Sequence, residues 1–220
     1  MNVGKLVVLE GLDGSGKTTQ LGLLCQALDT RGVRYRKLEF PCYDKDSSML
    51  VRMYLNGQFG SDPEDVNAYA ASSFYAVDRY ASYRTDWGAA YDAGEIFVAG
   101  RYTTSNAIHQ GAKLSGTARR TYMDWLFDYE YRLLGLPEPD AVIFLDVDVA
   151  LALANIEKRR AGRDIHENHA SYLARCRESA LEAAARYGWY TVPCGEGGVM
   201  RPAAEIGQEI LKIINRVGIC

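Results

Sequence analysis

One short stretch near the start of the chain has residue types and spacing suited to binding phosphate. Residues 11–18, GLDGSGKT, match the pattern G-x-x-x-x-G-K-[ST]. The glycines within it allow backbone amide groups to converge on one anion, while a lysine can reach terminal phosphates and a threonine hydroxyl can bind Mg²⁺. We therefore predict a nucleoside triphosphate site. Its predicted contacts are Gly11, Leu12, Asp13, Gly14, Ser15, Gly16, Lys17, Thr18 and Thr19, with Thr18 as the metal ligand.

A loop of this kind lies between a strand and a helix, and the flanking sequence predicts both. The apolar run at 5–10 predicts a strand, and residues 16–32 predict a helix that ends at Gly32. Strands alternating with helices predict one α/β domain, residues 1–220, with a parallel sheet covered on both faces. The other predicted strands are 33–40, 95–101, 140–147 and 189–194. The other predicted helices are 62–94, 105–114, 117–136, 150–160, 170–188 and 202–217.

The composition argues against several classes of partner. A formal net charge of -3 gives no overall basic field that would hold a nucleic acid polymer. No apolar stretch approaches the roughly 18 residues of a membrane-spanning helix, so we predict no membrane contact. The five cysteines are scattered and include no CxxC pair, which predicts reduced thiols in a cytoplasmic protein.

Several motifs follow one another along the chain: VVLEGLDGSGKTTQ, FP, FYAVDR, GRYTTSNAIHQG, PDAVIFLDVD and GRDIHE. In this order and spacing they resemble the thymidylate kinases, P-loop nucleoside monophosphate kinases that transfer the γ-phosphoryl group of ATP to dTMP. The resemblance implies a P-loop kinase fold with a five-stranded parallel sheet and a small lid at about 158–169. It also implies ATP and dTMP as substrates, dTDP and ADP as products, Mg²⁺ as cofactor, and a homodimer.

Two of these motifs predict an acceptor site. Tyr75 and Arg79 lie four residues apart, so they share one face of the predicted helix and could hold a flat base between a ring and a guanidinium. Arg101 ends a predicted strand at the carboxyl edge of the sheet, where it could clamp a phosphate. The resemblance implies that matching positions bind the base, the sugar and the acceptor phosphate. The predicted substrate contacts are Asp13, Phe40, Pro41, Tyr43, Tyr75, Arg79, Arg101, Ser105, Asn106, His109 and Gln110.

The phosphate loop itself carries no arginine, so the cation that offsets charge on the transferring group must come from elsewhere. The basic segment before and within 161–169 interrupts two predicted helices, as a lid does in kinases of this kind. Arg159 and Arg163 are the candidates, with Arg160 as a third. A solvated basic helix end is the alternative for each of them. The predicted catalytic residues are Lys17, Arg101, Arg159 and Arg163.

Three positions depart from the family pattern. Gly100 stands where the family has an aspartate beside the phosphates; Asp146 is our first candidate for a substituting, metal-binding acid, and Asp13 is the second. Tyr43 stands where the family has an arginine on the acceptor phosphate, and Lys45 could supply the charge. His109 replaces a tyrosine that crowds the sugar 2′ position. A kinase for another deoxynucleotide or deoxynucleoside, or a nucleotide-binding homologue with weakened catalysis, therefore remains as an alternative.

Overall fold

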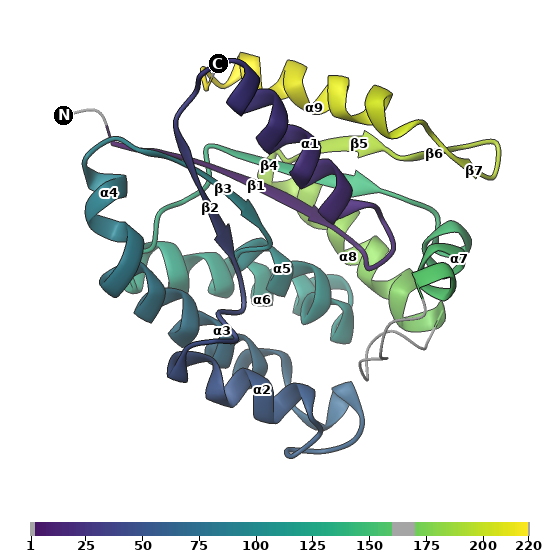
Figure 1. Ribbon diagram of the computed structural model, residues 1–220. Coiled ribbons are helices and arrows are strands. Elements are labelled where there is room, and N and C mark those ends of the chain that lie inside the picture. Colours follow the sequence, from purple (N-terminus) through teal and green to yellow (C-terminus); the bar gives the residue numbers. More distant parts are fainter. Residues whose placement is uncertain (1–2, 160–169, 220) are drawn as a thin grey trace.

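A five-stranded parallel sheet forms the centre of the molecule, in the order β2-β3-β1-β4-β5 (Figure 1). The computed structural model describes residues 3–159 and 170–219. The predicted parallel sheet of five strands is confirmed, and the carboxyl ends of its strands meet at one edge. The strands are β1 (Lys5–Gly11), β2 (Tyr35–Glu39), β3 (Ile96–Gly100), β4 (Ala141–Asp146) and β5 (Tyr190–Pro193).

Helices cover both faces of this sheet, as the alternating pattern predicts (Figure 1). One face carries α1 (Lys17–Thr30) and α9 (Ala203–Arg216). The opposite face carries α3 (Ala68–Ser82), α4 (Gly88–Asp92), α5 (Thr103–His109), α6 (Gly116–Phe127) and α8 (Ala170–Tyr187). Two more helices pack on this second layer, α2 (Met49–Leu55) against α3 and α7 (Val149–Arg159) against α8.

The core is divided by the sheet because successive side chains of a strand point to opposite faces. Val7 of β1 is fully buried with Leu24 of α1 and Ile210 of α9. Val8, the next residue, is fully buried on the other side in a cluster that includes Trp87. Burial on both faces explains why the central strand reads as a continuous apolar run in the sequence.

The register of β2 against β3 fixes which residues lie side by side at the carboxyl edge. Leu38 pairs with Ala99, and Glu39 pairs with Gly100. Leu38 and Ala99 are buried in the cluster around Trp87, on the face away from α1. Because faces alternate along a strand, Glu39 and position 100 both point toward the face that carries α1.

The predicted helix 62–94 is divided at its start. Asp62 caps a separate 3₁₀ turn, η2 (Pro63–Asp65), through a hydrogen bond from the Glu64 amide. The following residues are extended, and α3 begins only after Asn67, whose side chain accepts a hydrogen bond from the Ala70 amide. From there the helix continues through a π-helical turn, η3 (Tyr83–Trp87), into α4.

Several short elements have no counterpart in the sequence prediction. Helix α2 was not predicted, nor was the hairpin of β6 (Gly195–Glu196) and β7 (Val199–Met200). Gly197 and Gly198 form the hairpin turn with φ of 57° and 78°, a conformation that glycine adopts without strain. The 3₁₀ turn η1 (Asp46–Ser48) was not predicted either, whereas the 3₁₀ turn η4 (Gly111–Lys113) and the π-helical turn η5 (Asp128–Leu133) lie within the helices predicted at 105–114 and 117–136.

Candidate active site

The phosphate loop connects β1 to α1 and surrounds a cavity of about 360 Å³. Gly14 and Gly16 have φ of 80° and 87°, and a Cβ on Gly14 would lie 2.2 Å from the Ala152 carbonyl oxygen of α7. Lys17 Nζ donates to the Gly11 carbonyl at 2.7 Å. Helix α1 begins without a side-chain cap and without an acid in its first turn, so its N–H groups and dipole favour an anion.

Most predicted nucleotide contacts lie around this cavity. Residues 12–18 line it, whereas Gly11 and Thr19 do not. The Ser15 hydroxyl is buried and has no hydrogen-bond partner among the described residues. A ligand in the cavity would supply that partner. Because Mg²⁺ uses few protein oxygens and takes the rest from phosphates and water, the Thr18 hydroxyl fits a magnesium ion bound with a nucleotide.

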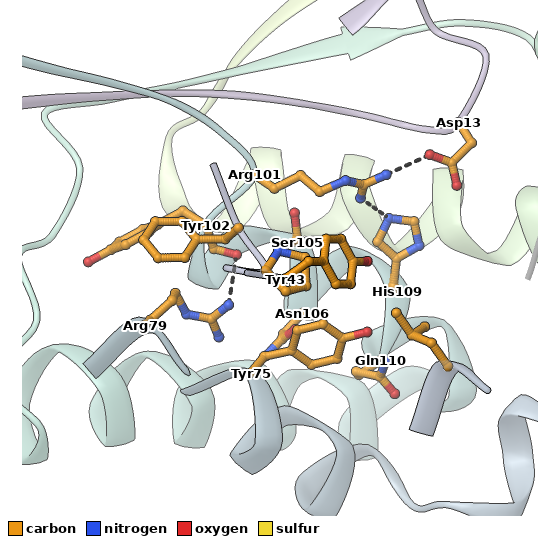
Figure 2. A pocket seen from close by; sticks show the side chains of 13 residues that line it. Asp13, Tyr43, Tyr75, Arg79, Arg101, Tyr102, Ser105, Asn106, His109 and Gln110 are labelled. Carbon is orange, nitrogen blue, oxygen red and sulfur yellow. Dashed lines mark hydrogen bonds and ion pairs between the residues drawn. The ribbon is translucent and has the colours of Figure 1, made fainter. Parts of the chain in front are cut away.

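A second cavity of about 250 Å³ adjoins the first, and we call it the acceptor cavity because every predicted substrate contact lines it (Figure 2). Its walls come from the segment after β2, from α3, and from the end of β3 with α5. Sequence reasoning missed two lining residues, Leu55 and Tyr102. Leu55 ends the unpredicted helix α2, and Tyr102 stands between two residues that were predicted, so neither gave a separate signal.

Arg101 lies at the junction of the two cavities and lines both. Its guanidinium donates to Asp13 Oδ1 at 2.5 Å and contacts His109 Nε2 at 2.9 Å (Figure 2). Burial opposes its charge, but the carboxylates of Asp13 and Glu10 outweigh burial and raise the pKa of Arg101. Its φ of 93° lies in the region that favours glycine, a strained conformation that often marks functional sites.

The contact with Arg101 also fixes the state of His109. An arginine nitrogen can only donate, so His109 Nε2 is the acceptor and the ring is neutral with its proton on Nδ1. Cys176 Sγ lies 3.7 Å from that Nδ1, and the Tyr172 hydroxyl donates to the His109 carbonyl at 3.0 Å. The imidazole is thus an oriented partner for Arg101.

Arg79 is held below the acceptor cavity by a buried carboxylate that sequence reasoning missed. Its Nε and Nη2 donate to Glu130 Oε2 and Oε1 at 2.6 and 2.5 Å, and Thr103 Oγ1 donates to Glu130 Oε2 at 2.8 Å. Burial opposes the charge of Arg79, but Glu130 outweighs it and raises the pKa of the guanidinium. The third nitrogen, Nη1, donates a long hydrogen bond of 3.5 Å to the Tyr102 carbonyl, and the side chain lines the acceptor cavity (Figure 2).

Helix α5 is fastened to the end of β1 by Glu10, which is fully buried. The Glu10 carboxylate accepts hydrogen bonds from the Ser105 hydroxyl at 2.8 and 2.9 Å, from Thr104 Oγ1 at 2.7 Å and from the Tyr102 amide at 3.2 Å. Ser105 therefore bonds to Glu10 while it also lines the acceptor cavity. Further along α5, the buried Gln110 Oε1 lines the acceptor cavity and has no hydrogen-bond partner among the described residues.

Some predicted residues lie apart from these cavities or outside the described part of the chain. Asp146 makes a bidentate ion pair with Arg177, at 2.6 and 3.0 Å, and lines neither cavity. Lys45 lines neither cavity, and its charge lies 3.7 Å from Asp44. The Arg159 side chain, Arg160 and Arg163 lie outside the described residues, as does the predicted lid from 160 to 169.

Within the described ranges, no three acidic, histidine or cysteine side chains are grouped to hold a metal ion by themselves. No helix within those ranges is long and apolar enough to cross a bilayer. A metal at this site would therefore be bound jointly by the protein and by nucleotide phosphates.

Comparison with known proteins identifies relatives along most of the chain. The family model described as thymidylate kinase matches residues 9–197. The thymidylate kinase of Mycobacterium tuberculosis H37Rv is 32% identical over 162 residues, covering 72% of this chain and 73% of the relative. Human thymidylate kinase is 33% identical over 168 residues, covering 76% of this chain and 71% of the relative. The solved structure of Candida albicans thymidylate kinase has a TM-score of 0.72 over 99% of this chain and 93% of that one, at 22% identity, and shows the same fold.

Proposed function

This chain belongs to the thymidylate kinase family, and from that premise we propose that it transfers the γ-phosphoryl group of ATP to dTMP, giving dTDP and ADP. One observation carries the proposal: the phosphate-loop cavity and the acceptor cavity share a common wall. The residues that line both are Asp13, Phe40, Pro41, Tyr43 and Arg101. A donor phosphate on one side and an acceptor phosphate on the other would meet there.

The chemistry that these residues support is positioning and charge stabilisation. Lys17 and the N-terminus of α1 face the donor phosphates, and Arg101, oriented by Asp13 and His109, faces the acceptor phosphate. Holding two reactants in line can account for about 7–11 kcal/mol of a barrier. Mg²⁺, bound with Thr18, would neutralise charge on the donor phosphates. Arg159 and Arg163 are the proposed sources of the remaining positive charge.

The acceptor cavity suits a pyrimidine base. The Tyr75 ring lies on one side of it, the Arg79 Nη1 offers a donor, and Gln110 Oε1 offers an acceptor (Figure 2). A pyrimidine with a carbonyl next to an N–H presents the complementary pair of groups. Because a site that hydrogen-bonds a substrate strongly rejects analogues lacking the partner group, base discrimination is expected to exceed sugar discrimination.

We also propose that the enzyme is cytoplasmic and works as a homodimer. Every cysteine that the structure describes is a free thiol, which agrees with a reducing compartment. Tyr69, Val77 and Tyr80 of α3 are exposed and offer an apolar surface for a second copy. Sedimentation at micromolar concentration tests the dimer.

An acceptor panel tests the reaction. Purified protein with ATP and Mg²⁺ is assayed by ADP release against dTMP, dUMP, dCMP, UMP, the ribose analogue of dTMP, and thymidine. The expected result is that dTMP has the highest kcat/KM, with the Lys17→Ala variant as the blank. Faster turnover of another acceptor, by tenfold or more in kcat/KM, would replace dTMP as the substrate.

A further inference from the structure

The carboxylate missing at Gly100 has a replacement candidate on the neighbouring strand. Gly100 ends β3 and lines the phosphate-loop cavity, and a Cβ there would point at Leu21 of α1, 2.9 Å from its Cδ2. Glu39 ends β2, pairs with Gly100 in the sheet register, and lines the same cavity. The two positions therefore lie side by side at the carboxyl edge, on the face where α1 begins.

Glu39 lies one strand further out than position 100 but points to the same face of the sheet. Neighbouring strands lie about 4.8 Å apart, and paired residues of parallel strands point to the same face. One extra methylene is shorter than that spacing, so the Glu39 carboxylate enters the phosphate-loop cavity from the β2 side and does not fill the space of an aspartate at position 100. The family aspartate is absent here, but an acid on the correct face and beside the correct position is present.

The surroundings of Glu39 also suit an active group. Only two of the described residues lining this cavity are acids, Asp13 and Glu39, and Asp13 is paired with Arg101. Glu39 forms an ion pair with Lys37, which lies two residues earlier on the same face and lines the same cavity. Its side chain is 70% exposed, and an exposed ion pair contributes little to stability, so leaving Lys37 for a metal would cost Glu39 little.

We propose that Glu39 supplies, from the adjacent strand, the carboxylate that Gly100 lacks, and that with Thr18 it forms the protein side of the Mg²⁺ site. The inference rests on the proposed kinase function and deepens it. It fits the donor set of this cavity, because Mg²⁺ takes oxygen ligands, keeps several waters, and is commonly held by one or two carboxylates together with substrate phosphates. Glu39 acts toward the metal and its water, while Arg101 acts toward the acceptor.

The test measures metal and nucleotide binding without turnover. ADP is titrated by calorimetry into the wild type, Glu39→Gln and Glu205→Gln, with and without Mg²⁺, and Mn²⁺ binding to each ADP complex is followed by electron paramagnetic resonance. Glu205 is the matched control, because it is an exposed acid near an arginine, Arg201, but lies on α9 and lines no phosphate-loop cavity. We expect the affinity for the metal to be about 10-fold lower in Glu39→Gln than in the wild type and unchanged in Glu205→Gln. The affinity for ADP measured without metal should be the same in all three proteins.

A rescue variant makes the assignment specific. In Glu39→Gln/Gly100→Asp the carboxylate returns on the neighbouring strand, and metal affinity is expected to recover most of the loss. Equal metal affinity in Glu39→Gln and wild type would overturn the inference, as would a loss that also appears without metal. These measurements need no acceptor, so they remain decisive if dTMP proves to be the wrong substrate. A wild type that binds no ADP would overturn the kinase proposal itself.

Discussion

The buried ion pair of Arg79 and Glu130 allows a direct test of what holds Arg79 in the acceptor cavity. Glu130→Gln keeps the size and shape of the side chain and removes its charge. Glu130 is fully buried, Arg79 is 2% exposed, and three hydrogen bonds from Arg79 and Thr103 converge on the carboxylate. In the variant one donor of Arg79 or Thr103 faces an amide NH₂, and the guanidinium charge is left without its counter-charge.

The expected loss of stability follows from that geometry. Removing one partner of a buried ion pair costs about 3–5 kcal/mol, because the remaining charge stays in a low-dielectric environment. The free energy of unfolding of an ordinary domain is about 5–15 kcal/mol, so the variant would lose a large part of its stability. At about 2–4 °C per kcal/mol for a chain of this size, the melting temperature would fall by about 6–20 °C.

Urea denaturation followed by circular dichroism measures the change in the free energy of unfolding. The slope of that free energy against urea concentration should be the same in variant and wild type, which excludes a change in compactness. Asp128→Asn is the matched control, because Asp128 lies in the same π-helical turn and pairs with Arg132 at an exposed position. That control is expected to leave the denaturation midpoint unchanged. The KM for dTMP should rise in Glu130→Gln while the KM for ATP stays constant, since Arg79 lines only the acceptor cavity.

A second variant separates stability from binding. Arg79→Met/Glu130→Leu removes both charges, and apolar replacement of a buried pair is often neutral or stabilising. It should regain most of the stability that Glu130→Gln loses while acceptor binding remains impaired. If Glu130→Gln lowers the free energy of unfolding by less than about 1 kcal/mol, the reasoning about an uncompensated charge is refuted.

Three further predictions concern other buried groups. Burial lowers the pKa of Lys113 to about 8, so between pH 8 and 10 the unfolded chain binds more protons than the folded one; urea denaturation should show wild type gaining stability relative to Lys113→Met across that range, and a constant difference would contradict this. Burial raises the pKa of Cys176 to about 12, and peptide mapping should find it unmodified by iodoacetamide in native protein at pH 8, labelling there being the contrary result. Ser105→Ala should cost about 1.5–3 kcal/mol in thermal or urea unfolding because Glu10 loses a donor, and Thr104→Ala should cost a similar amount; a changed KM for dTMP at unchanged stability would instead mean that Ser105 touches the substrate.

The fold could be predicted where its signals are local. Residue types and hydrophobic periodicity predict the phosphate loop, the apolar strands and the helices around them. The five-stranded parallel sheet is confirmed. The sequence did not predict the break in the helix expected at 62–94. Asp62 and Asn67 are both good N-caps, and the sequence does not say which of them starts the long helix. The β6–β7 hairpin has only two residues in each strand, too few for a period.

The site divides in the same way. The predicted substrate contacts and most of the predicted nucleotide contacts line the two cavities, whereas the groups that hold them in place were missed. Glu130 reaches Arg79 over 51 positions and Glu10 reaches Ser105 over 95. Nothing in the local sequence separates Glu130, which is buried, from Asp128, which is exposed two residues earlier. Such pairings arise only when the fold brings distant segments together.

The hydrogen bonds of Glu10 have a consequence for inhibitor design. Glu10 immediately precedes the phosphate loop, and its carboxylate holds the first residues of α5, so the walls of the two cavities are joined at one point. The gap between them is then a built-in dimension of the protein. A bisubstrate compound, with two nucleosides joined by a phosphate chain, should therefore show a sharp optimum in chain length. The hydrogen bonds of Glu10 fix the distance between the two cavities. A linker one phosphate too short could not span that distance, and a linker one phosphate too long would have to buckle.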